Sequence, residues 1–421
     1  MLKKVEILQV TRDAVSELMG DNYDSSTKDS IATLPLSDLI DFGVNTVGIN
    51  TTIPNDMWMK VLCGKCAEFI VENRKLELDL PQIFKTSFEW GGFIEVVKFD
   101  LQGVYDSLIY SQAALTDPNS KFYGKTIAEI EHDIYKVNFD SKIYDEFKDF
   151  MIPYTKPNDA LKTGLRSEND YLKFMGGMIT AIENTLTQII NTYGHALISS
   201  AIAYTMTEDG YTQGITGANV DGSNNCIHLL TEYIAVTGDN TWTAKKMLNS
   251  DDALAWINMR IENVRGYMKD NTQAYNNHEK PMFSTNIHGV MLKEVKNAYV
   301  NICTRNSYNP VTLGDWHFVN CWQSVKDSNG KYFEYDTNST IMITKDGNKG
   351  IYGISGGTIT DFVGENVIAF LYDEKAIGMT VNDTKTTSNY TSVTDTVNVF
   401  TNKRLNYVVN TDFPMVSFVL D

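Results

Sequence analysis

The chain closes with two apolar stretches, ENVIAFLYDEKAIGMTVND at residues 365–383 and RLNYVVNTDFPMVSFVLD at residues 404–421. In the first stretch, Val367, Ala369 and Leu371 alternate with their neighbours and therefore share one side of an extended chain. Such period-two placement predicts a β-strand. The residues between these three are apolar as well, which favours a strand buried on both faces.

The same pattern continues along the rest of this segment. A turn is expected at residues 373–375, then a strand with Ile377 and Met379 on one side, then a polar loop rich in Thr, Ser and Asn. A long final strand follows, interrupted near Pro414, and its alternating apolar residues are Leu405, Tyr407, Val409, Phe413 and Met415. We therefore expect this segment to be tied into a sheet.

Length and composition indicate a globular chain with more than one lobe. The 421 residues exceed what one simple core usually holds, and 43% of them are hydrophobic. Only nine prolines are present, and no proline-rich linker separates the parts. The lobes are therefore expected to interleave.

The charge balance argues against a protein that acts mainly through phosphate contacts. The chain has 53 acidic and 36 basic residues, which gives a formal net charge of −17. Duplex binding needs clustered Lys and Arg. A protein that encloses nucleic acid without gripping it is still compatible with this balance, and most of the acidity is expected to serve solubility.

Targeting signals are not found in the sequence. The first residues, MLKKVEILQVTRDAVSEL, contain no apolar core of a signal peptide, and no run approaches the roughly 20 apolar residues of a membrane helix. Five cysteines without regular spacing suggest reduced thiols. We therefore expect a cytoplasmic setting and no membrane segment.

A long helix is predicted at residues 168–205. Ser167 and Asp170 fit a capping box at its start. Gly194 and His195 are expected to divide it into two pieces. Apolar residues advance along it mostly by three or four, at Tyr171, Phe174, Met175, Met178, Ile182, Leu186, Ile189, Tyr193 and Leu197.

The other segments complete an α+β chain. Residues 1–50 indicate an extended arm with one short helix, and Pro54 begins a helix that ends before Asn73. Strands are expected on both sides of Gly91-Gly92. Strands alternate with a helix over residues 281–364, which favours a mixed α/β lobe. Further helices are predicted at 127–135, at 226–236 and, in two pieces that meet near Ser250, at 241–271.

The motif Cys63-Gly-Lys-Cys66 has the spacing of a redox pair or of half a zinc site. A redox pair normally begins a helix after a strand, whereas this pair lies inside a predicted helix. The remaining cysteines are scattered at Cys226, Cys303 and Cys321. We therefore interpret Cys63 and Cys66 as small packing residues.

Two glycine-rich motifs match catalytic patterns by letter only. Gly124-Lys125-Thr126 is similar to the end of a P-loop, but Asn119 stands where that loop requires a glycine. Residues 353–357, GISGG, fit a nucleophile elbow around Ser355, but a strand is expected after the serine and no histidine follows His317. We therefore do not expect a nucleotide site at Gly124-Lys125-Thr126, and we interpret GISGG as a turn between strands.

The six histidines form no HExxH zinc motif; they are His132, His195, His228, His278, His288 and His317. Acidic neighbours flank His132 and His278, which is usual for a solvated surface. The adjacent carboxylates Asp251 and Asp252 are compatible with a hydrolase but are common in a chain this acidic. No catalytic, cofactor-binding or metal-ligating residue is assigned, and no enzymatic activity is expected.

The order of these elements resembles that of the major capsid proteins of tailed double-stranded DNA bacteriophages. Their fold is shared with herpesvirus shell floors and encapsulins. The likeness covers nearly the whole chain and is greatest to the compact members from small podoviruses. It is carried mainly by PNDMWMKVLCGKCAEFIVENRKLELDLPQIFKT at residues 54–86 and VIAFLYDEKAIGMTV at residues 367–381.

The resemblance implies an α+β fold in five parts. These are an N-terminal arm with the first helix (1–83), an extended β loop that reaches over a neighbouring subunit (84–165), a peripheral domain with a long spine helix (166–235), an axial α/β domain that meets its copies around fivefold or sixfold axes (236–373), and the closing strands of the peripheral domain (374–421).

The implied function is that of a major capsid subunit, which self-assembles as hexamers and pentamers into an icosahedral head around a phage genome. Implied partners are further copies, a scaffolding protein and a portal. DNA would be enclosed without sequence-specific binding, and no cofactor or membrane is implied. Assembly would take place in the cytoplasm of the bacterial host, and the final location would be the capsid of the virion.

Two alternatives are compatible with the residues. An encapsulin-type compartment would use the same fold to hold an enzyme in place of a genome. A carbohydrate-active or carbohydrate-binding protein would use the abundant Tyr and Trp for stacking on sugars. Most proteins of the second class are exported, and the missing signal peptide disfavours it.

Overall fold

The chain forms an α+β protein with two compact units. Residues Met1–Gly92 and Glu146–Asp421 form the larger, the main unit, and Phe93–Asp145 form the smaller, the insert unit. The computed structural model describes residues 4–19, 60–63, 65–66, 80, 83, 94–99, 112–133, 139–144, 147–157, 168–208, 225–269, 275, 286–305, 316–325, 333–335, 341–343, 362–391, 393–394 and 396–421.

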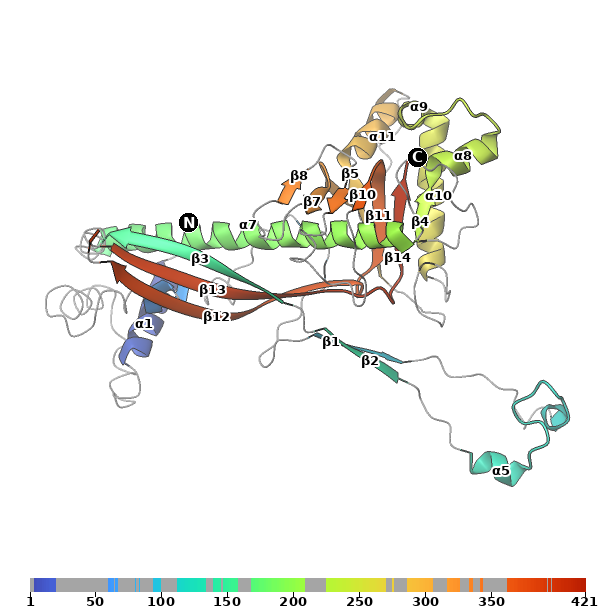
Figure 1. Cartoon of the computed structure of the whole chain (residues 1–421), viewed down its shortest axis with the longest axis horizontal. Helices are drawn as coiled ribbons and strands as arrows, with labels where there is room; N and C mark the ends of the chain where they lie inside the picture. The colour runs from blue at the N-terminus through green and yellow to red at the C-terminus, as the bar shows by residue number, and fades with distance from the viewer. Residues whose placement is uncertain are drawn as a thin grey trace. The chain divides into compact units, whose positions relative to one another are not determined.

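Helix α7, Glu168–Glu208, is the longest described element of the main unit (Figure 1). At 1.5 Å per residue, its 41 residues span about 60 Å. The predicted interruption at Gly194 and His195 is wrong, since the helix continues through both. Gly194 has a packing role instead: a Cβ atom there would lie 2.5 Å from Cδ2 of Leu80. The predicted capping residue Ser167 lies outside the described residues.

One sheet of the main unit contains three long antiparallel strands in the order β12–β13–β3. The predicted polar loop is shorter than expected, because its Thr-rich first half pairs as part of β12. Threonine suits a pleated, half-buried surface. Strand β3 contains Pro153. A proline is tolerated there because β3 lies at the edge of the described sheet, where one side of the strand has no neighbouring strand to which its N–H groups must donate. The bounds are β3 Phe147–Pro157, β12 Ile377–Thr391 and β13 Thr396–Val409.

The two faces of this sheet differ in burial. Along β13, every second residue from Val397 to Leu405 is buried, and those between are partly exposed. The buried face shares a core with α7 and with helix α1, Lys4–Met19. Helix α1 has 16 residues and is longer than the short helix predicted for the arm. Its buried residues Ile7, Val10 and Ala14 recur at helical spacing and pack in this core.

A second sheet of the main unit has five strands in the order β4–β14–β11–β5–β6. All seven residues of β11 are buried, which confirms the prediction of a strand covered on both faces. The first part of the predicted helix at 226–236 is wrong: its first three residues form β4, which pairs in parallel with β14. The bounds are β4 Cys226–His228, β5 Ile287–Leu292, β6 Trp316–Val319, β11 Val367–Asp373 and β14 Met415–Val419.

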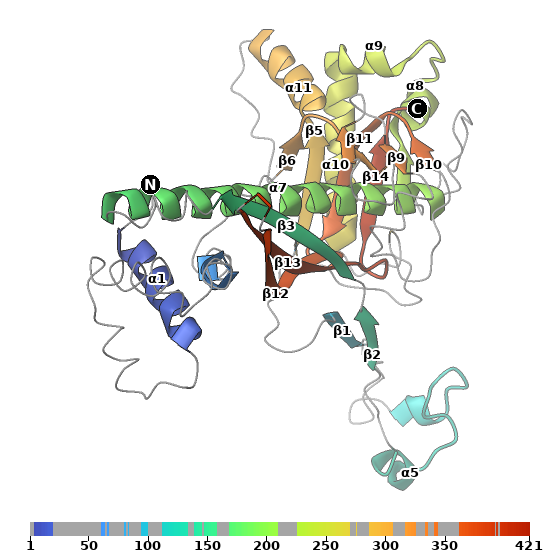
Figure 2. The ribbon, with the colours of Figure 1, turned by 60° about the vertical axis from the view of Figure 1, so that its left-hand side comes forward.

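Helices α8, α9, α10 and α11 group around the five-stranded sheet (Figure 2). The predicted helix pair near Ser250 and the predicted strand followed by a helix, now β5 and α11, are both confirmed. These helices are α8 Leu229–Thr237, α9 Ala244–Leu248, α10 Asp251–Lys269 and α11 Lys293–Arg305. A four-stranded sheet in the order β10–β9–β7–β8 comprises β7 Gln323–Val325, β8 Phe333–Tyr335, β9 Ile341–Ile343 and β10 Phe362–Gly364.

The chain passes between the three-stranded and the five-stranded sheet twice, through turns at residues 373–377 and 410–414. The backbone N–H of Asn410 donates to the carbonyl oxygen of Ala376 at 2.7 Å, which joins one turn to the other. The side chain of Asn410 also accepts a hydrogen bond from the N–H of Asp412 at 3.1 Å. Both turns are largely buried, so their polar groups depend on these internal partners.

In the insert unit, β1 Ile94–Phe99 pairs with β2 Phe139–Tyr144 as a two-stranded antiparallel sheet. The unit also contains the 3-10 helix η3 Gln112–Leu115 and helix α5 Ile127–Glu131. The hairpin predicted at Gly91-Gly92 lies outside the described residues.

A glycine pair gives a test of the packing around the five-stranded sheet. A Cβ atom at Gly289 of β5 would lie 2.6 Å from the Trp316 ring and 2.9 Å from the Arg265 guanidinium. We expect Gly289→Ala to lower the free energy of unfolding by about 1–3 kcal/mol through overpacking. Gly266→Ala, on α10 where nothing lies within 4 Å, should instead raise it by about 0.5–1 kcal/mol. Denaturant unfolding checks both, and equal effects at the two sites would contradict the packing argument.

Candidate functional site

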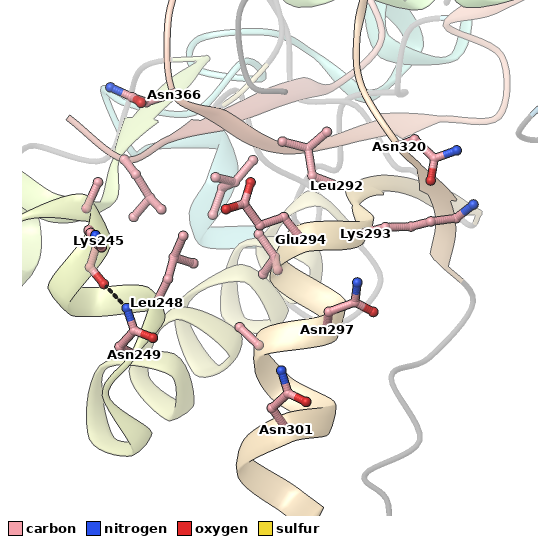
Figure 3. Close-up of a pocket in the computed structure, with 15 residues that line it drawn as sticks. Lys245, Leu248, Asn249, Leu292, Lys293, Glu294, Asn297, Asn301, Asn320 and Asn366 are labelled. Carbon is pink, nitrogen blue, oxygen red and sulfur yellow. Dashed lines mark hydrogen bonds between the residues drawn. The ribbon is translucent and has the colours of Figure 1, made fainter. Parts of the chain in front are cut away.

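A groove of about 790 Å³ lies on the part of the main unit that contains the five-stranded sheet. Helices α9 and α11 line it (Figure 3). Its apolar lining includes four buried residues from β5, α11, β11 and the chain end: Leu292, Val295, Ile368 and Leu420. The volume is within the range of about 300–1,000 Å³ typical of binding pockets.

Polar side chains dominate the rest of this groove. The charged ones are Lys245, Lys293 and Glu294, all exposed. Five carboxamides accompany them, and Figure 3 shows that they come from both sides of the groove: Asn249, Asn297, Asn301, Asn320 and Asn366.

Most of the carboxamides in the groove are available to a ligand. Asn249 donates through Nδ2 to the carbonyl oxygen of Lys245 at 2.7 Å, so its amide is engaged. The other four carboxamides make no side-chain hydrogen bond within the described part of the chain. Each can donate and accept.

The groove has the chemistry of a binding site and lacks a catalytic arrangement among its described lining residues. These include no hydroxyl, thiol or imidazole, and Glu294 is their sole carboxylate. Nucleophilic catalysis requires a nucleophile with an adjacent base, and acid–base hydrolysis of sugars requires two carboxyl groups. The groove therefore suits recognition of a polar ligand.

A smaller cavity of about 340 Å³ lies on the three-stranded sheet beside Asp149, Lys385 and Arg404. Nε of Arg404 donates to Oδ1 of Asp149 at 2.8 Å and Nη2 donates to Oδ2 at 3.1 Å. These hydrogen bonds hold the pKa of the Asp149 carboxyl below its ordinary value. The pair is largely exposed, so it contributes little to stability.

Cys63 and Cys66 lie buried in the core shared by α1, α7 and the three-stranded sheet. The Sγ atom of Cys63 is 3.5 Å from Sδ of Met178 on α7. Burial, and secondly the neighbouring Cys63, raise the pKa of the Cys66 thiol well above its ordinary value. Redox exchange and zinc binding both need the thiolate. No cluster of three or more metal-binding side chains occurs among the residues the structure describes.

The buried setting of the cysteine pair leads to a clear expectation. Cys63→Ala with Cys66→Ala should leave metal content and assembly unchanged, because the pair fills space instead of ligating. The unmodified thiols should also react slowly with a thiol reagent until the protein is unfolded. Elemental analysis and a thiol assay check these results, and zinc that disappears only in the double variant would contradict the packing role.

The Gly124-Lys125-Thr126 motif builds a turn and a helix cap in the insert unit. Gly124 has a φ of 70°, a left-handed conformation that glycine adopts without strain. Lys125 forms an ion pair with Asp133 at 2.6 Å. Thr126 is the N-cap of α5, and it forms a capping box with Glu129. The letters that imitate a P-loop thus have a local structural role.

The histidines that the structure describes do not gather into one cluster of metal-binding side chains. Nδ1 of His228 is 2.6 Å from Oδ1 of Asp421 in a largely buried contact. The rings of His195 and His317 have centroids 6.4 Å apart, whereas His288 lies beside Tyr372 at 6.0 Å. His132 is the exposed C-cap residue of α5, and Asp251 and Asp252 are exposed in the first turn of α10. His278 and the GISGG motif around Ser355 lie outside the described residues.

In the described part of the chain, no helix combines the length and apolar character needed to cross a membrane. No known family model matches the chain, and no curated protein matches it.

Solved structures similar to this chain come from bacteriophage capsids and heads. One is the capsid of Staphylococcus phage Andhra, with 12% identity, a TM-score of 0.43, and coverage of 81% of this chain and 83% of that chain. Another is the structure of the head fiber and inner core protein gp22 of native bacteriophage P68, with 11% identity, a TM-score of 0.43, and coverage of 83% and 88%. A third is the capsid of the cyanophage P-SCSP1u, with 11% identity, a TM-score of 0.36, and coverage of 82% and 88%.

Proposed function

We propose that this chain is the major capsid subunit of a tailed double-stranded DNA bacteriophage. The observation that carries the proposal is the arrangement of its elements. A 41-residue helix shares a core with a long three-stranded sheet, and the closing strands pass from that sheet into a second sheet surrounded by helices. The resemblance in sequence also implies a long helix followed by a mixed α/β lobe and closing strands.

The insert unit supports a role in contacts between copies. A two-stranded sheet is only marginally stable alone in water. The unit also exposes three large apolar side chains, Tyr123 at 56%, Ile127 at 53% and Ile143 at 62%. Each of these side chains is a candidate point of contact with a partner, and a shell is built from many repeated contacts between identical subunits.

The finer features of the function belong to the same proposal. The subunit would form hexamers and pentamers of an icosahedral head, with a scaffolding protein and a portal as partners. It would enclose DNA without sequence-specific binding, which suits a net charge of −17. It would act structurally and without a catalytic site, be assembled in the cytoplasm of the bacterial host and reside in the virion.

Electron microscopy of the recombinant protein, alone and coexpressed with its neighbouring genes, tests this proposal. Closed shells or capsomers of regular size are the expected result. A protein that stays monomeric under all these conditions would contradict it. A panel of glycosides serves as a second arm, since robust turnover abolished by one carboxylate substitution would favour the carbohydrate-active alternative.

A further inference from the structure

We propose that the groove between α9 and α11 is a docking site for an extended acidic segment of a second copy of this chain. The inference rests on the proposed function, because it names a contact between copies. It concerns the lining described above: an apolar floor, two lysines, one glutamate and four open carboxamides.

The charge of the groove is complementary to that of another copy. Its lining has Lys245 and Lys293 against the single carboxylate of Glu294, whereas the whole chain has 53 acidic and 36 basic residues. Two copies with a net charge of −17 each repel one another at long range. Attraction is therefore concentrated where lysines outnumber acids, and an acidic segment of the incoming copy fits such a place.

The carboxamides suit the main chain of that segment. An asparagine side chain offers one acceptor and two donors, which match the N–H and C=O groups of an extended backbone. Asn297 and Asn301 are four residues apart and therefore lie on the same face of α11. Figure 3 shows both beside the groove, with Asn320 and Lys293 above them in the view. These asparagines would orient the backbone of a bound strand, and the lysines would select its acidic side chains.

The apolar floor gives the groove a preformed shape. Leu292, Val295, Ile368 and Leu420 are each no more than 3% exposed, so the groove is backed by residues of the packed core. A docking site on core elements needs little rearrangement, which lowers the cost of association. The lack of aromatic side chains among its described lining residues disfavours a sugar as occupant, because sugar sites commonly offer an aromatic face for stacking.

Charge reversal at the lysines tests the groove. The variant carries Lys245→Glu and Lys293→Glu, and the matched control carries Lys269→Glu and Lys375→Glu, two exposed lysines outside the groove. Sedimentation of the full-length proteins measures the fraction assembled at low and physiological salt. We expect the groove variant to need at least tenfold more protein for assembly than the parent and the control to stay within twofold.

A variant that leaves the net charge unchanged distinguishes the effect of the groove from the effect of net charge. Asn297→Ala with Asn301→Ala removes two carboxamides on an exposed helix face and should weaken assembly in the same direction, with an unchanged circular dichroism spectrum. Assembly of both groove variants at the level of the parent would overturn the docking site and leave the capsid proposal intact. An equal loss in the lysine control would also overturn it. A parent protein that never associates would overturn both proposals.

Discussion

Replacement of residues 93–145 by a flexible Gly/Ser linker is expected to give a folded main unit that no longer forms shells. The insert unit has its own internal contacts, and its removal leaves in place every strand pair that the structure describes in the main unit. The loss of assembly follows because the removed unit presents exposed apolar side chains to which we assign contacts between copies. Circular dichroism and thermal unfolding check the fold, and electron microscopy checks the shells.

The boundaries of this deletion determine whether the remaining chain can fold. A deletion that continued through β3 would remove a strand that pairs with β13 from Thr396 to Asn406, and such a chain should fail to fold. A milder companion variant, Tyr123→Asp with Ile127→Asp, keeps the insert unit but makes its exposed apolar surface polar. It should also reduce assembly. Normal shells from the linker variant would refute the assigned role of the insert unit.

The largest loss of stability from a single substitution in the five-stranded sheet is expected for Phe370→Ala. Phe370 lies on the central strand β11 with 0% exposure, and its ring stacks on that of Tyr372 with centroids 5.5 Å apart. Burial raises the pKa of Tyr372 well above its ordinary value, as expected for a water-excluded core. Truncation of a buried phenylalanine removes apolar contacts and leaves a cavity, at a cost of about 3–5 kcal/mol.

Denaturant unfolding of the main unit measures this loss as a shift of the midpoint. Thr387→Ala on β12 is the control, since Thr387 is exposed on the three-stranded sheet, and it should change the free energy of unfolding by less than about 0.5 kcal/mol. A Phe370→Ala variant within that same limit would show that the five-stranded sheet is not the core that its burial indicates.

Segments with one dominant pattern were predicted best. The buried run of β11 and the strand followed by a helix at β5 and α11 lie where periodicity placed them. Gly194 misled because helix propensity is a local quantity, whereas the reason for this glycine is contact with Leu80 far away in sequence. The Thr-rich half of β12 misled because threonine and asparagine favour loops locally, and only pairing with β13 extends them.

Pairing with a distant strand also explains the error at Cys226–His228. These residues continue an apolar helical pattern, yet β14 offers them a parallel partner that the sequence does not reveal. The five-part division of the chain stays a prediction. Within its last part, residues 374–421, strands β12 and β13 belong to one sheet and β14 to the other.

The groove was missed for a different reason. Its lining residues come from α9, from β5 with α11, from the end of β6 and from β11 with the chain end. None of these segments contains a recognisable motif on its own. The nearest signal was the spacing of Asn297 and Asn301, which places two carboxamides on one helix face. The predictions made from the cysteines, glycine motifs and histidines concerned other places in the fold.

Helix α7 contacts strands of each of the three sheets that the structure describes in the main unit. Because one continuous helix contacts these sheets, a force applied to one sheet is transmitted through the helix to the others. The two turns at 373–377 and 410–414 add covalent connections between the three-stranded and the five-stranded sheet. A subunit braced in this way resists shear between its sheets, which is the property that the proposed shell role requires of a wall subunit.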